Sequence, residues 1–142
     1  MIRLPLAAAL AATLLFADLQ TVRNEPNLEK RSRLALANAD AALTQARTAY
    51  GKEDMKEMEI RLAEVRESVE LAHTALEATG KKAGRSPGPF KYAETKSREL
   101  LKRIAGLKEE MDFAERKAVE SVQNRVQEIH DAWLNGILTR AK

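Results

Sequence analysis

Apolar residues recur at spacings of three and four along most of this chain, the period of an amphipathic α-helix. The clearest run alternates between the two spacings without a gap: Met55, Met58, Leu62, Val65, Val69, Ala72 and Leu76. Asp54 and Glu57 form a capping-box pair that predicts the start of this helix, and Gly80 predicts its end after about Thr79. Six glutamates lie off this seam and are expected on a solvated face: Glu53, Glu57, Glu64, Glu67, Glu70 and Glu77.

An alanine stripe predicts an earlier helix. After Asn27, the stretch 28–50 contains neither glycine nor proline, and Gly51 is expected to end it. Its stripe is spaced 4-3-4-3 and consists of Ala35, Ala39, Ala42, Ala46 and Ala49, flanked by Leu36, Leu43 and Tyr50. Alanine has the highest helix propensity, and its small side chain lets a partner backbone approach closely.

Glycine and proline interrupt the pattern after this pair of helices. The ten residues 80–89 hold three glycines and two prolines, which predicts a hinge. A third helix is expected from near Phe90, with these residues inward: Ala93, Leu100, Leu101, Ile104, Leu107 and Met111. Gly106 inside it costs about 1 kcal/mol relative to alanine.

A second capping pair, Asp112 with Glu115, predicts a break before a fourth helix. Its inward positions are Phe113, Ala118, Val122, Val126, Ile129, Trp133 and Ile137. Without that break, helices three and four would form one rod of about 75 Å, too long for its neighbours to cover. We therefore expect an all-α fold with two antiparallel helical hairpins forming a four-helix bundle-like domain. Trp133 is expected to cap the bundle, with a projecting binding anchor as the alternative.

Composition narrows the class of protein. The 142 residues include no cysteine, which excludes a disulfide scaffold, a thiolate metal site and a cysteine nucleophile. With 32% charged and 4% aromatic residues, the chain suits long surface-charged helices better than a β-sandwich. A formal charge of +3 is too small to indicate a nucleic-acid partner, and none is expected.

The first seventeen residues have the pattern of a secretory signal. Arg3 makes the start positive, Leu4–Ala17 is an uncharged stretch, and charged residues follow from Asp18. The stretch is shorter than the ~20 residues of a membrane-spanning helix. We expect removal of 1–17 after Ala17, and a single all-α domain over 18–142 with its hinge at 80–89. The location would be periplasmic or extracellular. The alternatives are an uncleaved membrane tether and a buried helix of a cytosolic protein.

The first predicted turn carries a resemblance to a known family. Ala49-Tyr50-Gly51-Lys52-Glu53-Asp54, followed by Met58, Leu62 and Val65, resembles the middle of a tetratricopeptide repeat (TPR). Asp54 matches the acidic turn position, but Glu53 stands where the family prefers glycine and Met58 where it prefers alanine. The closing proline is missing and the second hairpin does not repeat the pattern. As a whole, the sequence is similar to small exported bacterial helical proteins of unknown function. That resemblance implies a TPR-like hairpin and no catalytic residues.

Two histidine motifs are candidates for metal binding or catalysis. Glu70-x-x-His73 has the spacing of a di-iron bundle site, which needs a second copy. The only other candidate is Gln127-x-x-His130, where glutamine replaces the bridging carboxylate. His130-Asp131 lacks the strained serine turn of a nucleophilic triad. We therefore expect no enzyme activity, no cofactor and no metal.

A basic segment stands out from the rest of the chain. Between positions 81 and 103, eight basic residues face two acidic ones, Glu94 and Glu99, an excess of +6, with Phe90 and Tyr92 interleaved. The eight are Lys81, Lys82, Arg85, Lys91, Lys96, Arg98, Lys102 and Arg103. Such a segment is typical of sites for anionic lipid or another polyanion, and the alternative is a solvated helix face.

These patterns favour a non-enzymatic exported protein that acts as an interaction or structural module of the bacterial cell envelope, with a protein partner. One alternative is a membrane-tethered protein that binds anionic surfaces. The other is a metal-dependent helical-bundle enzyme.

Overall fold

The computed structural model describes residues 19–139, which form a small all-α helical bundle. The expected signal segment, 1–17, lies outside these residues. A short helical turn at 19–23 precedes the bundle. The long helices are α2 (Leu28–Gly51), α3 (Met55–Ala78), α4 (Pro87–Glu110) and α5 (Arg116–Leu138), with a 3₁₀ turn, η1 (Phe113–Glu115), before α5.

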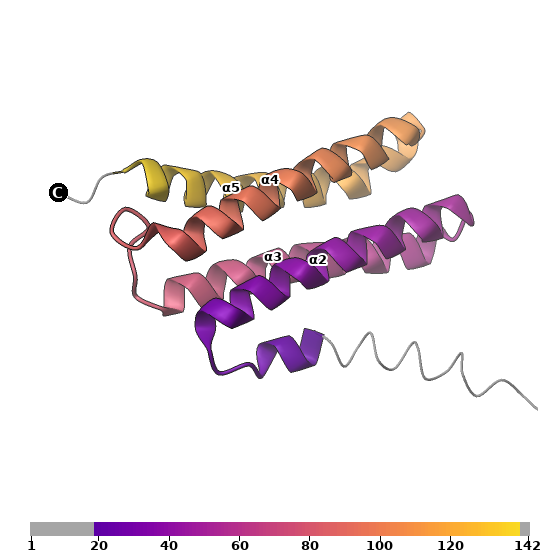
Figure 1. Ribbon diagram of the computed structural model, residues 1–142. Helices are drawn as coiled ribbons and strands as arrows, with labels where there is room; N and C mark the ends of the chain where they lie inside the picture. Colours follow the sequence, from indigo (N-terminus) through magenta and orange to yellow (C-terminus); the bar gives the residue numbers. More distant parts are fainter. Residues whose placement is uncertain (1–18, 140–142) are drawn as a thin grey trace, which may run out of the picture.

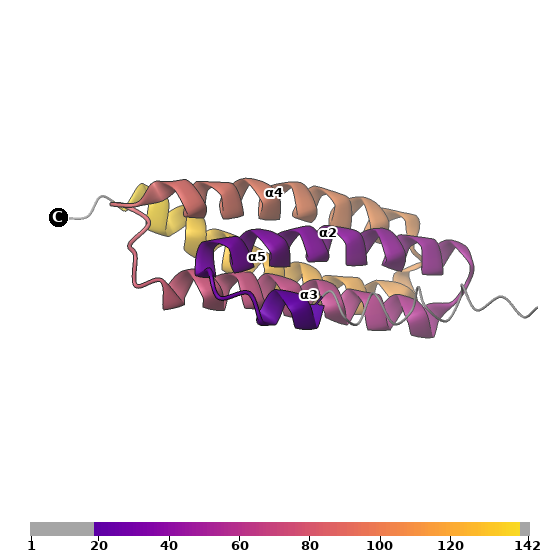
Figure 2. The ribbon, with the colours of Figure 1, turned by 60° about the horizontal axis from the view of Figure 1, so that its bottom comes forward.

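The long helices pack as two antiparallel hairpins, as predicted. Figure 1 shows the α2–α3 hairpin in one layer and the α4–α5 hairpin in the other. Across the layers, α4 packs on α2 and α5 packs on α3 (Figures 1 and 2). We call the end that carries the connection 79–86 the loop end. It also holds the start of α2 and the end of α5 (Figure 1). The opposite end holds the turns 52–54 and 111–115, and we call it the turn end.

The core confirms the seam and the alanine stripe. Leu62, Val65 and Val69 are buried on α3, and Ala35 and Ala46 are fully buried on α2. The seam residue Met55 is the exception, since it is only half-buried in the first turn of α3. The small side chains of α2 let the two helices of the first hairpin lie close together.

Local hydrogen bonds and backbone angles explain where the first hairpin turns. Asp54 Oδ1 accepts from the backbone N–H of Glu57 at 3.1 Å, which confirms the predicted cap of α3. Gly80, just beyond α3, has a φ of 69°, as a helix-ending glycine often does. At the first turn the prediction was less accurate, because Gly51 remains inside α2 and Glu53 takes the positive φ of 59°.

The hinge is shorter than predicted. α4 begins at Pro87, three residues before Phe90, so both prolines lie in its first turn. A proline at these positions costs no hydrogen bond within the helix, because the first N–H groups of a helix have no intrahelical partner. The connection is therefore 79–86, and Ala83 within it is 93% buried against the bundle (7% exposed).

The predicted break between the last two helices is confirmed, but its cause differs from the prediction. The side chain of Asp112 makes no capping hydrogen bond. The backbone closes the turn instead: the N–H of Glu115 donates to the carbonyl of Asp112 at 3.0 Å. Arg116 Nε also donates to the carbonyl of Met111, at 3.1 Å.

One inward assignment in the second hairpin was wrong, and three others are only partly buried. Phe113 is 89% exposed because it lies in η1, ahead of the regular turns of α5. The core position is filled by Val119 instead, which is fully buried. Leu101, Ala118 and Ile137 are half-buried and pack against the core.

The glutamate face of α3 is less solvated than predicted. The helical turn 19–23 lies along this side of α3, with Leu19 and Val22 buried and Arg23 3.7 Å from Glu67. Glu64 is consequently only 16% exposed and pairs with Arg61. Short-range periodicity on α3 could not reveal this cover, because it comes from another part of the chain.

Candidate functional site

The eight basic residues of the predicted site fall into three groups. One group lies on the connection: Lys81, Lys82 and Arg85. A second lies at spacings of seven and four on α4, and therefore on one helix face: Lys91, Arg98 and Lys102. The third lies on the flank of α4 toward α2: Lys96 and Arg103. The segment is thus continuous in sequence but divided in space.

The α2-facing group is engaged within the bundle. Arg103 forms an ion pair with the carboxylate of Asp40 on α2, and its Nη2 donates to Thr44 Oγ1 at 2.8 Å. Lys96 lies 3.5 Å from Glu99 and 5.8 Å from the ring centre of Tyr92. Arg103 therefore helps to fix α4 against α2, whereas the contacts of Lys96 lie within α4.

We name Lys91, Arg98 and Lys102 the cation row. The row faces outward, because the opposite face of α4 supplies buried core residues such as Ala93 and Ile104. Lys91 and Lys102 are exposed and form no ion pair within residues 19–139, whereas Arg98 lies 3.6 Å from Glu94. At 1.5 Å per residue, the row extends about 16 Å along the helix.

On the connection, one cation is fixed and two are free of ion pairs. Lys81 Nζ donates to Glu29 Oε1 on α2 at 2.6 Å, which ties the loop to the start of the first hairpin. Lys82 and Arg85 are exposed and have no carboxylate partner in the described part of the chain. Both line a hollow at the loop end.

The hollow has a volume of about 740 Å³ and lies between the ends of α3 and α5, the connection and the start of α4. Trp133 lies in its wall, is only 2% exposed and stacks edge-on against His73 with ring centres 6.0 Å apart. The prediction that Trp133 caps the bundle is confirmed. Two buried nitrogens of these rings, Trp133 Nε1 and His73 Nδ1, have no hydrogen-bond partner within the described chain.

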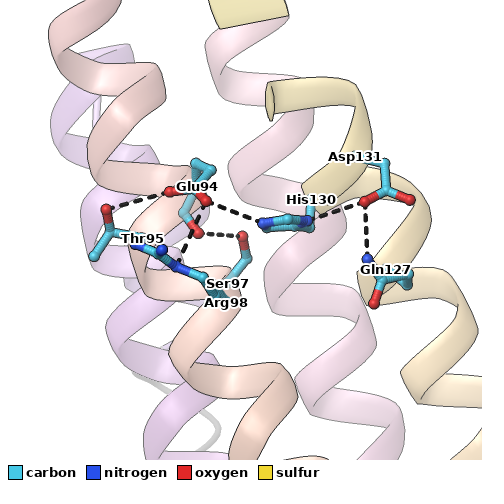
Figure 3. Close-up of polar contacts among 7 residues, drawn as sticks. All are labelled: Glu94, Thr95, Ser97, Arg98, Gln127, His130 and Asp131. Carbon is cyan, nitrogen blue, oxygen red and sulfur yellow. Dashed lines mark hydrogen bonds and ion pairs between the residues drawn. The ribbon is translucent and has the colours of Figure 1, made fainter. Parts of the chain in front are cut away.

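A chain of polar contacts through the buried His130 joins α4 to α5 near this end (Figure 3). His130 Nε2 lies 3.2 Å from Glu94 Oε1, and its Nδ1 lies 3.1 Å from Asp131 Oδ1. Gln127 Nε2 donates to the same oxygen of Asp131 at 2.8 Å. The hydrogen bond with His130, and then the one from Gln127, lower the pKa of Asp131 below its ordinary value of 3.8.

This network fixes the two helices of the second hairpin. The His130 side chain is 9% exposed and that of Glu94 is 13% exposed, so the pair is largely shielded from water. Sequence analysis missed the pair because Glu94 and His130 are 36 residues apart and no motif links them. Their pairing follows only from the packing of α4 against α5.

The two candidate metal-binding histidine motifs form separate contacts in the structure. Glu70 bonds to Arg125 at 3.0 Å, while His73 lies 3.2 Å from Glu77. His130 is held by the network described above. Among residues 19–139, no three histidine, aspartate or glutamate side chains are arranged to hold a metal ion.

The fold and these surfaces define the protein as a small all-α helical bundle. None of its described helices is long and apolar enough to cross a membrane. Comparisons with protein-family models, curated proteins and solved structures gave no match.

Proposed function

We propose that the protein is a non-enzymatic interaction module, exported to the bacterial cell envelope, that docks an acidic protein partner on the cation row. The observation that carries this proposal is that Lys91 and Lys102 are exposed on one outward face and have no carboxylate partner among residues 19–139. Elsewhere in the bundle, cations such as Lys81 and Arg103 are paired with carboxylates of α2.

Charge complementarity would make docking on the row selective for acidic partners, but it would add little to the affinity. A single exposed ion pair contributes about 0.2–1 kcal/mol, so the partner must also supply other contacts. A row of like charges steers an acidic partner toward the correct face and rejects basic ones. Salt should weaken the encounter, since the screening length is about 8 Å at physiological ionic strength.

The pattern of residues 1–17 supports the exported location, since a basic start, an apolar stretch and Ala17 are features of a cleaved secretory signal. The N-terminus of the protein from its native host tests this part. Recovery of chains that start near Asp18 is expected, and soluble cytosolic chains that retain Met1 would contradict export.

A TPR-like character of the α2–α3 hairpin is also part of the proposal. It is supported by the cap that Asp54 forms at the acidic turn position and by burial of Met58, Leu62 and Val65.

Site-specific crosslinking in the native envelope tests the docking surface. A photoreactive phenylalanine analogue in place of Tyr92, 39% exposed beside Lys91, should capture an acidic partner. The same analogue in place of Ile60, 47% exposed on α3, should not capture it. The double variant with Lys91→Gln and Lys102→Gln should not form the crosslinked product. The control variant with Lys56→Gln and Lys117→Gln lacks two exposed cations elsewhere and should still form it. A product that survives loss of Lys91 and Lys102 would contradict the proposal.

An anionic membrane surface is the second candidate, because the row lies along the outward face of a helix and can meet a flat surface. Each Lys or Arg near such a membrane contributes about 1 kcal/mol. Flotation with phosphatidylglycerol vesicles tests it. Binding that disappears with Lys91→Gln and Lys102→Gln, and with added salt, would favour this candidate. Absence of binding at low salt would exclude it.

A further inference from the structure

The hollow at the loop end combines an apolar wall with a basic rim. Trp133, Phe90 and Ala83 in its lining are all at least nine-tenths buried. Lys82 and Arg85, also in the lining, are exposed cations without an ion pair in the described chain. Its volume of about 740 Å³ lies within the range of roughly 300–1,000 Å³ that is usual for small-molecule sites.

The one carboxylate in the lining already has a partner. Glu77 Oε1 lies 3.2 Å from His73 Nε2, on the α3 side of the hollow. The nearby Glu29 is taken up by Lys81. Lys82 and Arg85 therefore have no carboxylate partner among residues 19–139, and an anion that enters the hollow meets two donors of charge-assisted hydrogen bonds.

The geometry points to a binding site for a small amphipathic carboxylate at the loop end. The apolar body of the ligand packs against Trp133 and Phe90, and its carboxylate lies at the rim between Lys82 and Arg85. Apolar burial supplies affinity, and the two cations select the charged end group. This inference goes beyond the docking function proposed above, because it uses none of the residues of the cation row.

Decanoate is the probe, and Trp133 is the reporter, since it is the only tryptophan in the chain. Titration with decanoate should change the emission of Trp133 saturably, with the affinity confirmed by calorimetry. Decanol, which has the same body without the charge, should bind at least about tenfold more weakly. Acetate, which has the charge without the body, should leave the emission unchanged.

Three variants locate the site. Lys82→Gln with Arg85→Gln should weaken decanoate binding by roughly tenfold and leave decanol binding unchanged. Lys91→Gln with Lys102→Gln is the matched control, because it removes two cations outside the hollow, and it should change decanoate binding less than twofold. Ala132→Phe places a ring in the hollow from an exposed position of α5 and should block both ligands. Circular dichroism verifies that each variant keeps its helices.

Failure of decanoate to bind the wild-type protein would overturn the inference. Equal affinity for decanoate and decanol, or equal loss in the two double variants, would overturn it as well. None of these outcomes bears on the crosslinking test of the cation row, so the two proposals fail separately.

Discussion

Single residues with a left-handed backbone determine how the first hairpin and the loop end turn. Gly80 has a φ of 69° and no atom within 4 Å of an added Cβ, so conformation and not space requires glycine there. Glu53 adopts a φ of 59° despite its side chain, at the position where a tetratricopeptide repeat prefers glycine. The turn at Gly80 was predictable from its glycine. No comparable residue type in the sequence indicated the positive φ of Glu53.

Gly80→Ala should lower the free energy of unfolding by about 1 kcal/mol, because an L-residue is strained in the left-handed region. Gly51→Ala is the matched control. Gly51 is helical, and a Cβ there also meets nothing within 4 Å, so alanine should be neutral or stabilising by up to about 1 kcal/mol. Urea denaturation measures both. Equal effects at the two glycines would refute the conformational argument.

Asp131 makes the stability of α5 depend on pH. Its pKa is lowered first by the hydrogen bond with His130 and second by Gln127. A carboxylate with a lowered native pKa stabilises the fold above its unfolded value of about 3.8, and this contribution is lost as the pH falls through the native value.

Thermal melts from pH 5 to pH 2 should therefore fall less steeply for Asp131→Asn than for the wild type. Gln127→Ala, which removes only the weaker of the two hydrogen bonds, should give an intermediate slope. If all three proteins show the same slope, the network does not hold Asp131 in its ionised form.

At the scale of helices, buried seams give the hairpins their stability. The seam of α3 was predictable because a period of three and four is a local property of the sequence. The prediction placed Phe113 inward and did not name the buried Val119, because the register of α5 depends on where η1 ends. The start of α4 was predicted near Phe90 instead of Pro87, because a proline can mark either the interruption of one helix or the first turn of the next.

Leu62→Ala tests the seam. Leu62 is 1% exposed, and removal of its side chain should cost about 2–5 kcal/mol through lost burial and a residual cavity. Ile60→Ala, on the same helix but 47% exposed, is the control and should cost less than about 1 kcal/mol. Thermal denaturation that ranked the two variants in the opposite order would show that α3 presents a different face to the core.

For the molecule as a whole, the fold class and the order of helices could be predicted, and the candidate site only in part. Its eight basic residues were identified as one segment, but helix geometry turns Lys96 and Arg103 toward α2 and leaves the cation row outward. The hollow at the loop end was not predicted. Its lining comes from α3, the connection, α4 and α5, and only their packing brings Lys82 and Trp133 together.

In the proposed function, an acidic partner docks on the outward face of α4. The most direct measurement is to map backbone amide chemical shifts while poly-glutamate is added at low salt. We predict that the shifts concentrate around Lys91, Arg98 and Lys102, are reversed by added salt, and leave the turn end unchanged. Shifts centred on the turn 52–54, or the same shifts after Lys91→Gln with Lys102→Gln, would contradict the account.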